Sequence, residues 1–317
     1  MAVLLPIGRR RLRRYARLRE IERMDPERSY SDIWLLDMAY EFPWDMQLSG
    51  SISFYYSIAP PSIARLLVRT GELTENTAKR MDDTSILMWE TFRNGFTSPR
   101  GRAAVRQMNR IHRNAVKQVN SGGEQWRITN EEYLFVLATT MVTTLRGVER
   151  YGWRPLSDHE RTAAFRHFRE MGELMGLKDI PDSYDEFVRF HDSFVAAEFA
   201  YTPEAAKLWR ATRFMIVDVL TGWLPPLLVP AGRAVAEALL PALVGPDLRR
   251  AFGLRDPSPV LVRAVDLALR LRAGYVRALL PPRRESAMPD TVPTEQFPDG
   301  DYEISEVGPD HSVSRRP

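Results

Sequence analysis

Apolar residues recur every three or four positions along most of this chain, and no stretch shows the sustained alternation of a β-strand. Capping signals mark where helices begin, because a Ser or Thr side chain binds free amides of the first turn and a Glu three residues later strengthens the cap. The sequence therefore predicts an all-α fold, with helices over residues 74–94, 129–152 and 157–176 and further helices that begin at Ser183 and Thr202.

By composition the chain divides into three parts. Residues 1–24 hold seven arginines between Arg9 and Arg19 and are expected to form a basic helix. Residues 25–280 carry the helical pattern and are expected to form a single globular domain. Residues 281–317 are rich in Pro, Asp, Glu and Ser, a composition typical of disordered tails.

One apolar segment raises the question of membrane contact. Between Asp218 and Arg233 the chain runs 14 residues without a charge, but three prolines interrupt it. A spanning helix needs about 20 apolar residues, so we expect either a buried hairpin or a segment, within 214–245, that rests on a membrane. The arginine-rich start would contact anionic lipid or be a solvated leader helix. It lacks the interleaved aromatic residues of a nucleic-acid site.

The absence of cysteine narrows the chemistry. It excludes disulfides, thiolate zinc sites, iron–sulfur clusters, a cysteine nucleophile and cysteine-ligated heme. A cytoplasmic protein, with peripheral membrane contact as an alternative, is the simplest expectation. The sequence also has no P-loop, no G-x-G-x-x-G and no G-x-S-x-G, and the segment HERTA lacks the second histidine of a zinc-protease helix.

The five histidines are the remaining metal-ligand candidates. His159 lies in a first helical turn, where solvation is expected, and His311 lies in the tail. His167 and His191 stand among apolar residues and are expected to be ordinary core or boundary residues. His112 is different, because helical spacing places it in one row with apolar neighbours on an otherwise charged helix: Met108, Ala115 and Val119.

Arg80 and Thr84 strengthen the case for His112. They are one helical turn apart and share a face of an otherwise apolar helix. An inward-facing arginine needs a buried partner, since an unpaired buried charge is costly. Either Arg80 is a surface residue paired with Asp82 or Asp83, or it lines a polar pocket opposite His112. A single neutral imidazole suits heme, which brings its own four nitrogen ligands, and not a bare metal ion.

Between Arg19 and Leu280 the chain resembles the MpaB-type and latex-clearing (rubber oxygenase) heme oxygenases. The resemblance rests on the order and spacing of several segments, and its later part is closer to the MpaB members. These segments are REIERMDPERSYSDI, FYYSIAPPSIARLLVRTGEL, Arg80 with Thr84, NRIHRNAV, ITNEEYLFVLATT, ERYGWRPLSDHE and MGLKDIPDSYDEF.

The resemblance implies an all-helical domain that encloses heme b and binds its iron through one proximal histidine, here His112. Arg80 and Thr84 match the distal arginine and threonine of the rubber-cleaving members and would hydrogen-bond dioxygen. Asp83 stands where those members often carry a lysine that can reach the iron. Glu72 is a weak match for their distal glutamate. Fungal MpaB acts on a membrane-embedded prenylated intermediate, which would give the apolar and basic segments a common purpose.

Two functions compete at this point. The first is a heme b-dependent oxygenase that acts with O₂ on an olefinic, isoprenoid-like or other hydrophobic substrate. Arg80 and Thr84 would be its catalytic residues, His112 its iron ligand, and Arg80 a further contact to the heme. The second is a non-catalytic helical protein that binds heme or lipid. The aspartate at position 83 favours the second.

Overall fold

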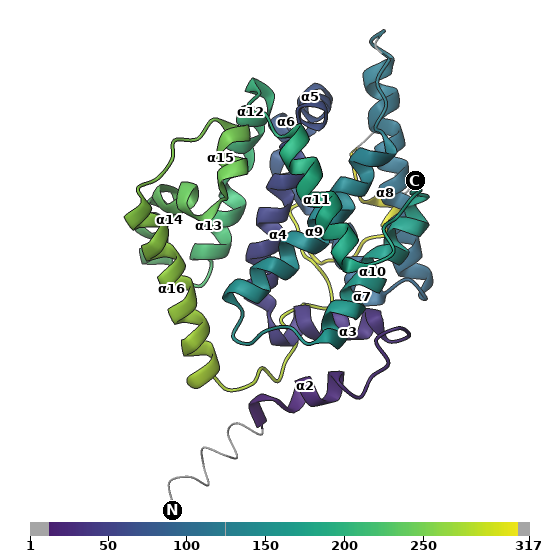
Figure 1. Ribbon diagram of the computed structural model, residues 1–317. Helices are drawn as coiled ribbons and strands as arrows, with labels where there is room; N and C mark the ends of the chain where they lie inside the picture. Colours follow the sequence, from purple (N-terminus) through teal and green to yellow (C-terminus); the bar gives the residue numbers. More distant parts are fainter. Residues whose placement is uncertain (1–12, 124, 310–317) are drawn as a thin grey trace, which may run out of the picture.

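Residues 13–123 and 125–309 are described by a computed structural model of the chain, and within these ranges the fold is all-α without a strand (Figure 1). The protein is therefore helical, as predicted. Its helices are α2 (Ala16–Ile21), α3 (Tyr30–Leu36), the π-helical turn η1 (Asp37–Glu41), α4 (Pro43–Ile58), α5 (Pro61–Thr70), α6 (Glu72–Glu75), α7 (Thr77–Asn94), α8 (Pro99–Asn120), α9 (Asn130–Tyr151), α10 (Asp158–Met175), α11 (Tyr184–Glu198), α12 (Pro203–Thr212), α13 (Phe214–Thr221), α14 (Val229–Leu243), α15 (Pro246–Phe252) and α16 (Pro259–Ala278), with 3₁₀ turns η2 (Pro226–Leu228) and η3 (Ile304–Glu306).

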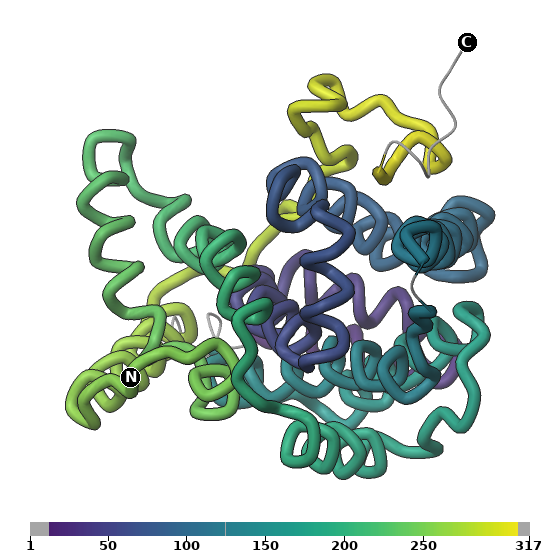
Figure 2. Tube along the Cα trace, turned by 90° about the horizontal axis from the view of Figure 1, so that it is seen from above, coloured from purple at the N-terminus to yellow at the C-terminus, as the bar shows by residue number. Residues whose placement is uncertain are grey.

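Helices α4 and α9 pack side by side in the middle of the molecule. Their close approach depends on Gly147, where an added Cβ would lie 1.9 Å from the Ser49 Oγ. One core cluster surrounds α3, α7, α8, α9 and α10, and a second joins α4 to α11–α15. Seen from above, α13, α14 and α16 extend to one side of these helices (Figure 2).

The predicted caps are present where the sequence placed them. Thr129 and Ser157 each form a complete capping box, and the side chains of Ser183 and Thr202 accept hydrogen bonds from Glu186 N and Ala205 N. The helix predicted over 74–94 is divided, and this expectation needs correction. Asn76 leaves the helical conformation, with φ −120° and ψ 39°, and separates the short α6 from α7.

The described part of the basic N-terminal helix belongs to the folded domain. Ile21 is fully buried, the Arg14 guanidinium lies 3.9 Å from the centre of the Trp153 ring, and that of Arg17 lies 4.0 Å from the Tyr40 ring. Such cation–π contacts stabilise modestly, by about 0.5–1 kcal/mol at exposed sites. Two of the seven arginines therefore serve packing, and three others, Arg9, Arg10 and Arg11, lie outside the described ranges.

Residues 285–309, which we call the C-terminal strap, follow α16 without α-helix, as the change in composition predicted. They are nevertheless packed, so the expectation of disorder does not apply to this part of the tail. Residues 310–317 lie outside the described ranges. Four strap side chains are buried in the first core cluster, and Ala287 N donates a hydrogen bond of 2.8 Å to Ala39 O. The four are Met288, Tyr302, Ile304 and Val307.

Deleting the strap should destabilise the protein. A chain that ends at Arg284 lacks the four buried side chains of the strap and exposes the core surface that they cover. The burial of each such side chain contributes about 1.5–3 kcal/mol to stability. We expect it to unfold at markedly lower urea concentration than the full chain, or to be insoluble. A chain that ends at Pro309 keeps the strap and should match the full chain. Equal unfolding midpoints for all three chains would show that the strap does not stabilise the domain.

Candidate functional site

A tight antiparallel hairpin of α7 and α8 positions the predicted site residues. At its turn Gly95 has φ +59°, and a Cβ on Gly101 would lie 1.8 Å from Gly95 O, so both positions require glycine. Ser98 caps α8 by accepting a hydrogen bond of 3.0 Å from Gly101 N. Because the two helices run antiparallel from this turn, the early part of α7, with Arg80, lies beside the later part of α8, with His112.

His112 is held as a neutral imidazole. Burial and, as the second cause, the nearby positive charge of Arg80 together lower the pKa of His112 to about 4. The ring centre lies 5.4 Å from that of Tyr133 on α9. Its Nδ1 atom is buried and has no hydrogen-bond partner among the described residues. A neutral ring with an unsatisfied nitrogen has the properties that a metal ligand needs.

Arg80 is a desolvated cation whose closest polar contact is a hydroxyl. Its guanidinium donates to Thr84 Oγ1, which in turn donates a 2.8 Å hydrogen bond to the backbone oxygen of Arg80. Burial lowers the pKa of Arg80, while the negative charges of Asp83 and Glu72 oppose the shift. Within the described ranges no carboxylate forms an ion pair with this guanidinium.

A fully buried arginine elsewhere in the fold, Arg154, shows how this protein otherwise accommodates such a charge. Arg154 donates to Glu41 Oε2 at 2.9 Å and to Glu160 Oε1 at 2.6 Å, and all three side chains are almost completely buried. These carboxylates raise the pKa of Arg154 against the effect of burial. Arg80 lacks equivalent partners, so an anion that reached it would gain the interaction that Arg154 obtains within the fold.

Asp83 does not reach toward His112. Its buried carboxylate accepts a hydrogen bond of 3.0 Å from Lys79 Nζ, and the same ammonium donates to Gly308 O of the strap at 2.6 Å. The alternative in which Arg80 is a surface residue paired with Asp82 or Asp83 is therefore not what the structure shows. Asp83 thus holds Lys79, whose ammonium links α7 to the strap.

Glu72 lies near the site, because its charge acts on the pKa of Arg80. It opens the short helix α6, directly after Gly71, whose φ of +76° turns the chain between α5 and α6. The sequence offered Glu72 only as a weak match. The break at Asn76, which the sequence did not predict, is what separates Glu72 from the helix that carries Arg80.

The C-terminal strap is the part of the site that sequence reasoning missed. Gln107 Nε2 donates to Val307 O at 2.6 Å and Arg110 donates to Ser305 O at 3.1 Å. A Cβ on Gly308 would lie 2.8 Å from Cδ1 of Ile111, the residue before His112. The strap thus fixes the segment of α8 that carries the histidine. The alternation of apolar and acidic residues in the strap, as in DYEISEV, was the sequence signal that could have predicted its packing.

His112 lies where α8 leaves the body of the protein, and this corrects the expected core-facing row. Met108 is buried, Ile111 is the last buried residue of the helix, and Ala115 and Val119 are only half-buried. The far end of α8 projects beyond the other helices (Figure 1). His112 is itself half-buried, so its ring is desolvated without being sealed from outside.

The other histidines are not paired with Arg80, although the Nε2 atom of His167, like Nδ1 of His112, is buried without a hydrogen-bond partner among the described residues. His167 is completely buried beside Trp34 and Phe96, and burial lowers its pKa to about 3. His191 Nε2 lies 3.2 Å from Thr139 Oγ1, and its Nδ1 lies 3.0 Å from Asp192 Oδ1. His159 is half-buried in the first turn of α10. His311 lies outside the described residues, among which no group of three or more His, Asp or Glu could hold a metal ion.

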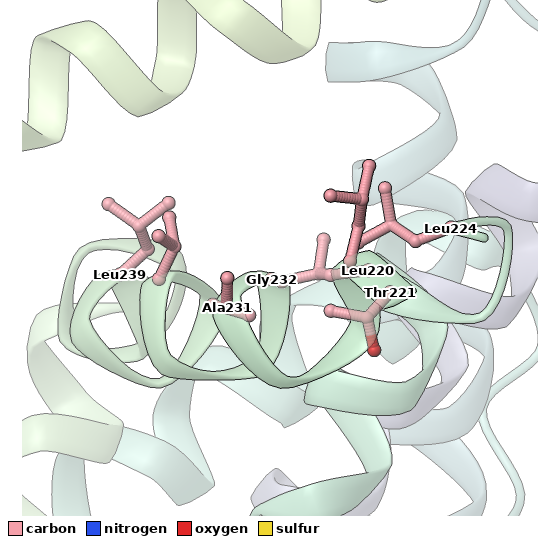
Figure 3. A pocket seen from close by; sticks show the side chains of 9 residues that line it. Leu220, Thr221, Leu224, Ala231, Gly232 and Leu239 are labelled. Atoms are coloured by element: carbon pink, nitrogen blue, oxygen red, sulfur yellow. The ribbon is translucent and has the colours of Figure 1, made fainter. Parts of the chain in front are cut away.

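An apolar groove of about 450 Å³ lies elsewhere, between α13 and α14 (Figure 3). Leu220 and Leu224 come from the α13 side, and Gly232 and Leu239 come from α14. These residues are on other helices than His112 and Arg80. Residues 226–243, which include α14, form the one described helical stretch that is long and apolar enough to cross a membrane by length and composition, and 11% of it is buried.

The chain is similar to known oxygenases over most of its length. Residues 45–284 match the family model described as ER-bound oxygenase mpaB/B'/Rubber oxygenase, catalytic domain. The ER-bound oxygenase mpaB' of Penicillium brevicompactum is 26% identical over 258 residues, which cover 77% of this chain and 57% of that protein. The ER-bound oxygenase mpaB of Penicillium roqueforti is 29% identical over 140 residues, which cover 43% of this chain and 44% of that protein.

Among solved structures, that of latex clearing protein LCP in the closed state superposes with a TM-score of 0.40 and 18% sequence identity, covering 85% of this chain and 74% of the other. The chain spans about half the length of the two fungal relatives. Because the family model extends across α4 to α16, which hold both His112 and Arg80, the chain belongs to the MpaB/rubber oxygenase catalytic-domain family.

Proposed function

We propose that this protein is a heme b-dependent oxygenase that acts with O₂ on an olefinic or isoprenoid-like hydrophobic substrate. His112 is the proposed iron ligand, and Arg80 and Thr84 are the proposed catalytic residues. The observation that carries the proposal is the close approach of a neutral imidazole that has an unsatisfied nitrogen to a buried guanidinium without an ion-pair partner. Membership of the oxygenase family supports the reaction class.

The donor set fits heme better than a bare metal ion. One histidine offers a single ligand, and the described residues contain no cluster that could complete a coordination sphere. Heme needs only one protein ligand because the porphyrin supplies four nitrogens. A pKa of about 4 keeps His112 deprotonated and able to bind iron at neutral pH. Arg80 has no ion-pair partner within the described residues, and a heme propionate or an anionic reactant would supply one.

When bound, heme supplies iron chemistry for the insertion of oxygen into, or the cleavage of, a carbon–carbon double bond. The residues of this chain would orient and polarise the reactants. Arg80 would provide a positive charge that stabilises negative charge on the reacting oxygen. Thr84 holds the guanidinium through their mutual hydrogen bond. The strap and the Lys79–Asp83 pair keep α7 and α8 from separating.

A non-catalytic heme- or lipid-binding protein is the second candidate. It is favoured by Asp83, because this carboxylate is paired with Lys79 and supplies no ligand for the iron. In that case Arg80 would bind a heme propionate and would have no role in turnover. The experiments on His112 and Arg80 separate the two candidates.

Removing the imidazole of His112 should abolish specific heme binding. We expect His112→Gly to fold, because the residue is only half-buried, and to bind heme at least about 100-fold more weakly, since even changes beyond the ligand shell cost metal sites 10–100-fold. Added imidazole should restore the Soret band if it can enter the space vacated by the ring. His159→Ala, a half-buried histidine on α10, is the matched control and should bind heme normally.

Heme affinity should be nearly independent of pH between about 7.5 and 5.5. The folded pKa of His112 is lowered to about 4, so protonation competes with iron only as the pH falls toward that value. An imidazole with the ordinary pKa of about 6.5 would lose up to tenfold in affinity per pH unit below 6.5. Spectroscopic titration of the apoprotein with heme at several pH values distinguishes these profiles.

Replacing Arg80 distinguishes the oxygenase from the non-catalytic heme- or lipid-binding protein. For an oxygenase, Arg80→Gln should keep heme but reduce turnover of a prenylated or unsaturated lipid by about 10²–10³-fold, as loss of one charge-stabilising donor does. Thr84→Val should cost less, because it keeps the positive charge of Arg80 and removes only the hydrogen bond that holds the guanidinium in place. In the apoprotein, Arg80→Gln should also raise the pKa of His112, as seen by NMR titration. Loss of heme from Arg80→Gln would identify a propionate anchor, and unchanged turnover would contradict its catalytic role.

A further inference from the structure

The apolar residues that remain exposed on this protein are concentrated at one end. The described chain has twelve large hydrophobic side chains with high exposure, and ten of them lie between Trp223 and Leu280. Both views show α13, α14 and α16 together on one side of the molecule (Figures 1 and 2), and α14 contacts α16. Exposed patches of this kind mark surfaces that bind a partner or a membrane.

Helix α16 is apolar on its outer side as well as its inner side. None of its 20 residues is buried, and the half-buried residues of its inner side include Val262, Val265 and Leu269. An outer stripe repeats at intervals of four and three residues, in which Val260, Leu267 and Leu271 are 74%, 57% and 64% exposed. The full stripe is Val260, Ala264, Leu267, Leu271, Gly274 and Ala278. A surface helix normally places polar residues on its outer side.

A row of arginines runs along one edge of this stripe. Arg263, Arg270 and Arg277 are exposed and stand seven residues apart, so they lie on the same side of the helix. Arg270 shares Asp266 with Arg150, and the row therefore keeps a net positive charge. Arginine can place its stem along an apolar layer while its guanidinium stays among polar headgroups.

We propose that the outer stripe of α16, its arginine row and the exposed tip at Trp223, Leu227 and Leu228 form a docking surface for a bilayer that contains anionic phospholipids. The tip residues are 73%, 90% and 52% exposed. The surface lies on the bilayer and α14 does not cross it, because Arg233 and Glu237 within α14 are engaged with Asp218 and Arg213 of the α12–α13 region. This inference does not depend on the heme or on the reaction.

A second copy of the chain is a poorer occupant, because of the charge pattern. The stripe has the spacing of a coiled-coil seam. Antiparallel pairing of two α16 helices would place the two arginine rows against each other. Parallel pairing would place each row beside Leu261, Ala268 and Tyr275, none of which carries a negative charge. Headgroups of anionic lipids neutralise the row in a way that another α16 cannot.

Vesicle flotation of the full chain tests this assignment. Binding is expected to vesicles with about 30% phosphatidylserine, and to weaken with salt and with neutral vesicles, because each arginine near an anionic surface contributes roughly fivefold in affinity. The variant Arg263→Glu/Arg270→Glu/Arg277→Glu should lose about 100-fold or more in binding. The matched control, Arg65→Glu/Lys207→Glu/Arg210→Glu, makes the same charge change at exposed positions of α5 and α12 and should bind normally.

A site-specific probe distinguishes insertion of the stripe from simple charge attraction. The chain has no cysteine, so Leu271→Cys and, as control, Leu174→Cys on α10 can each carry one environment-sensitive fluorophore. The fluorophore at position 271 should shift to shorter wavelength on anionic vesicles, and that at 174 should not. Equal binding by both charge-reversal variants, no shift at position 271, or a dimer in solution that Leu271→Ser dissociates would each overturn the proposal.

Discussion

The close antiparallel packing of α7 against α8 is the constraint on which the candidate site depends. It requires glycine at positions 95 and 101, since a side chain at either position would obstruct the turn or adopt a strained backbone. Only this packing places a guanidinium from one helix beside an imidazole from the other. Without it, the low pKa of His112 would lose one of its two causes, and Arg80 would have no reason to be desolvated.

Arg154, which is buried, and Arg80, which is half-buried, show that the same side chain has different roles in one fold. Arg154 joins the π-helical turn η1 to the start of α10 through two carboxylates, and its charge is satisfied by the protein alone. Arg80 has only a hydroxyl and its own helix in contact, while two carboxylates act on it from farther away. Because the positive charge of Arg80 has no carboxylate partner, a bound anion would gain a favourable electrostatic interaction there.

Much of this structure could be predicted from the sequence because its signals are local. Capping boxes at Thr129 and Ser157 involve residues three apart, and the pairing of Arg80 with Thr84 follows from one helical turn. Features that depend on distant residues were not predictable in this way. The contact of Gly308 with Ile111 joins residues far apart in sequence, and the proximity of Glu72 to Arg80 depends on a break at Asn76 that carries no strong signal.

Beside His112 the strap is held through its backbone. The oxygens of Ser305, Val307 and Gly308 accept hydrogen bonds there from side chains of α7 and α8. Backbone oxygens are the same in every residue type, so many different sequences could make these contacts. The match to the family model ends at residue 284, whereas the folded domain continues through the strap, which adds four buried side chains to the first core cluster.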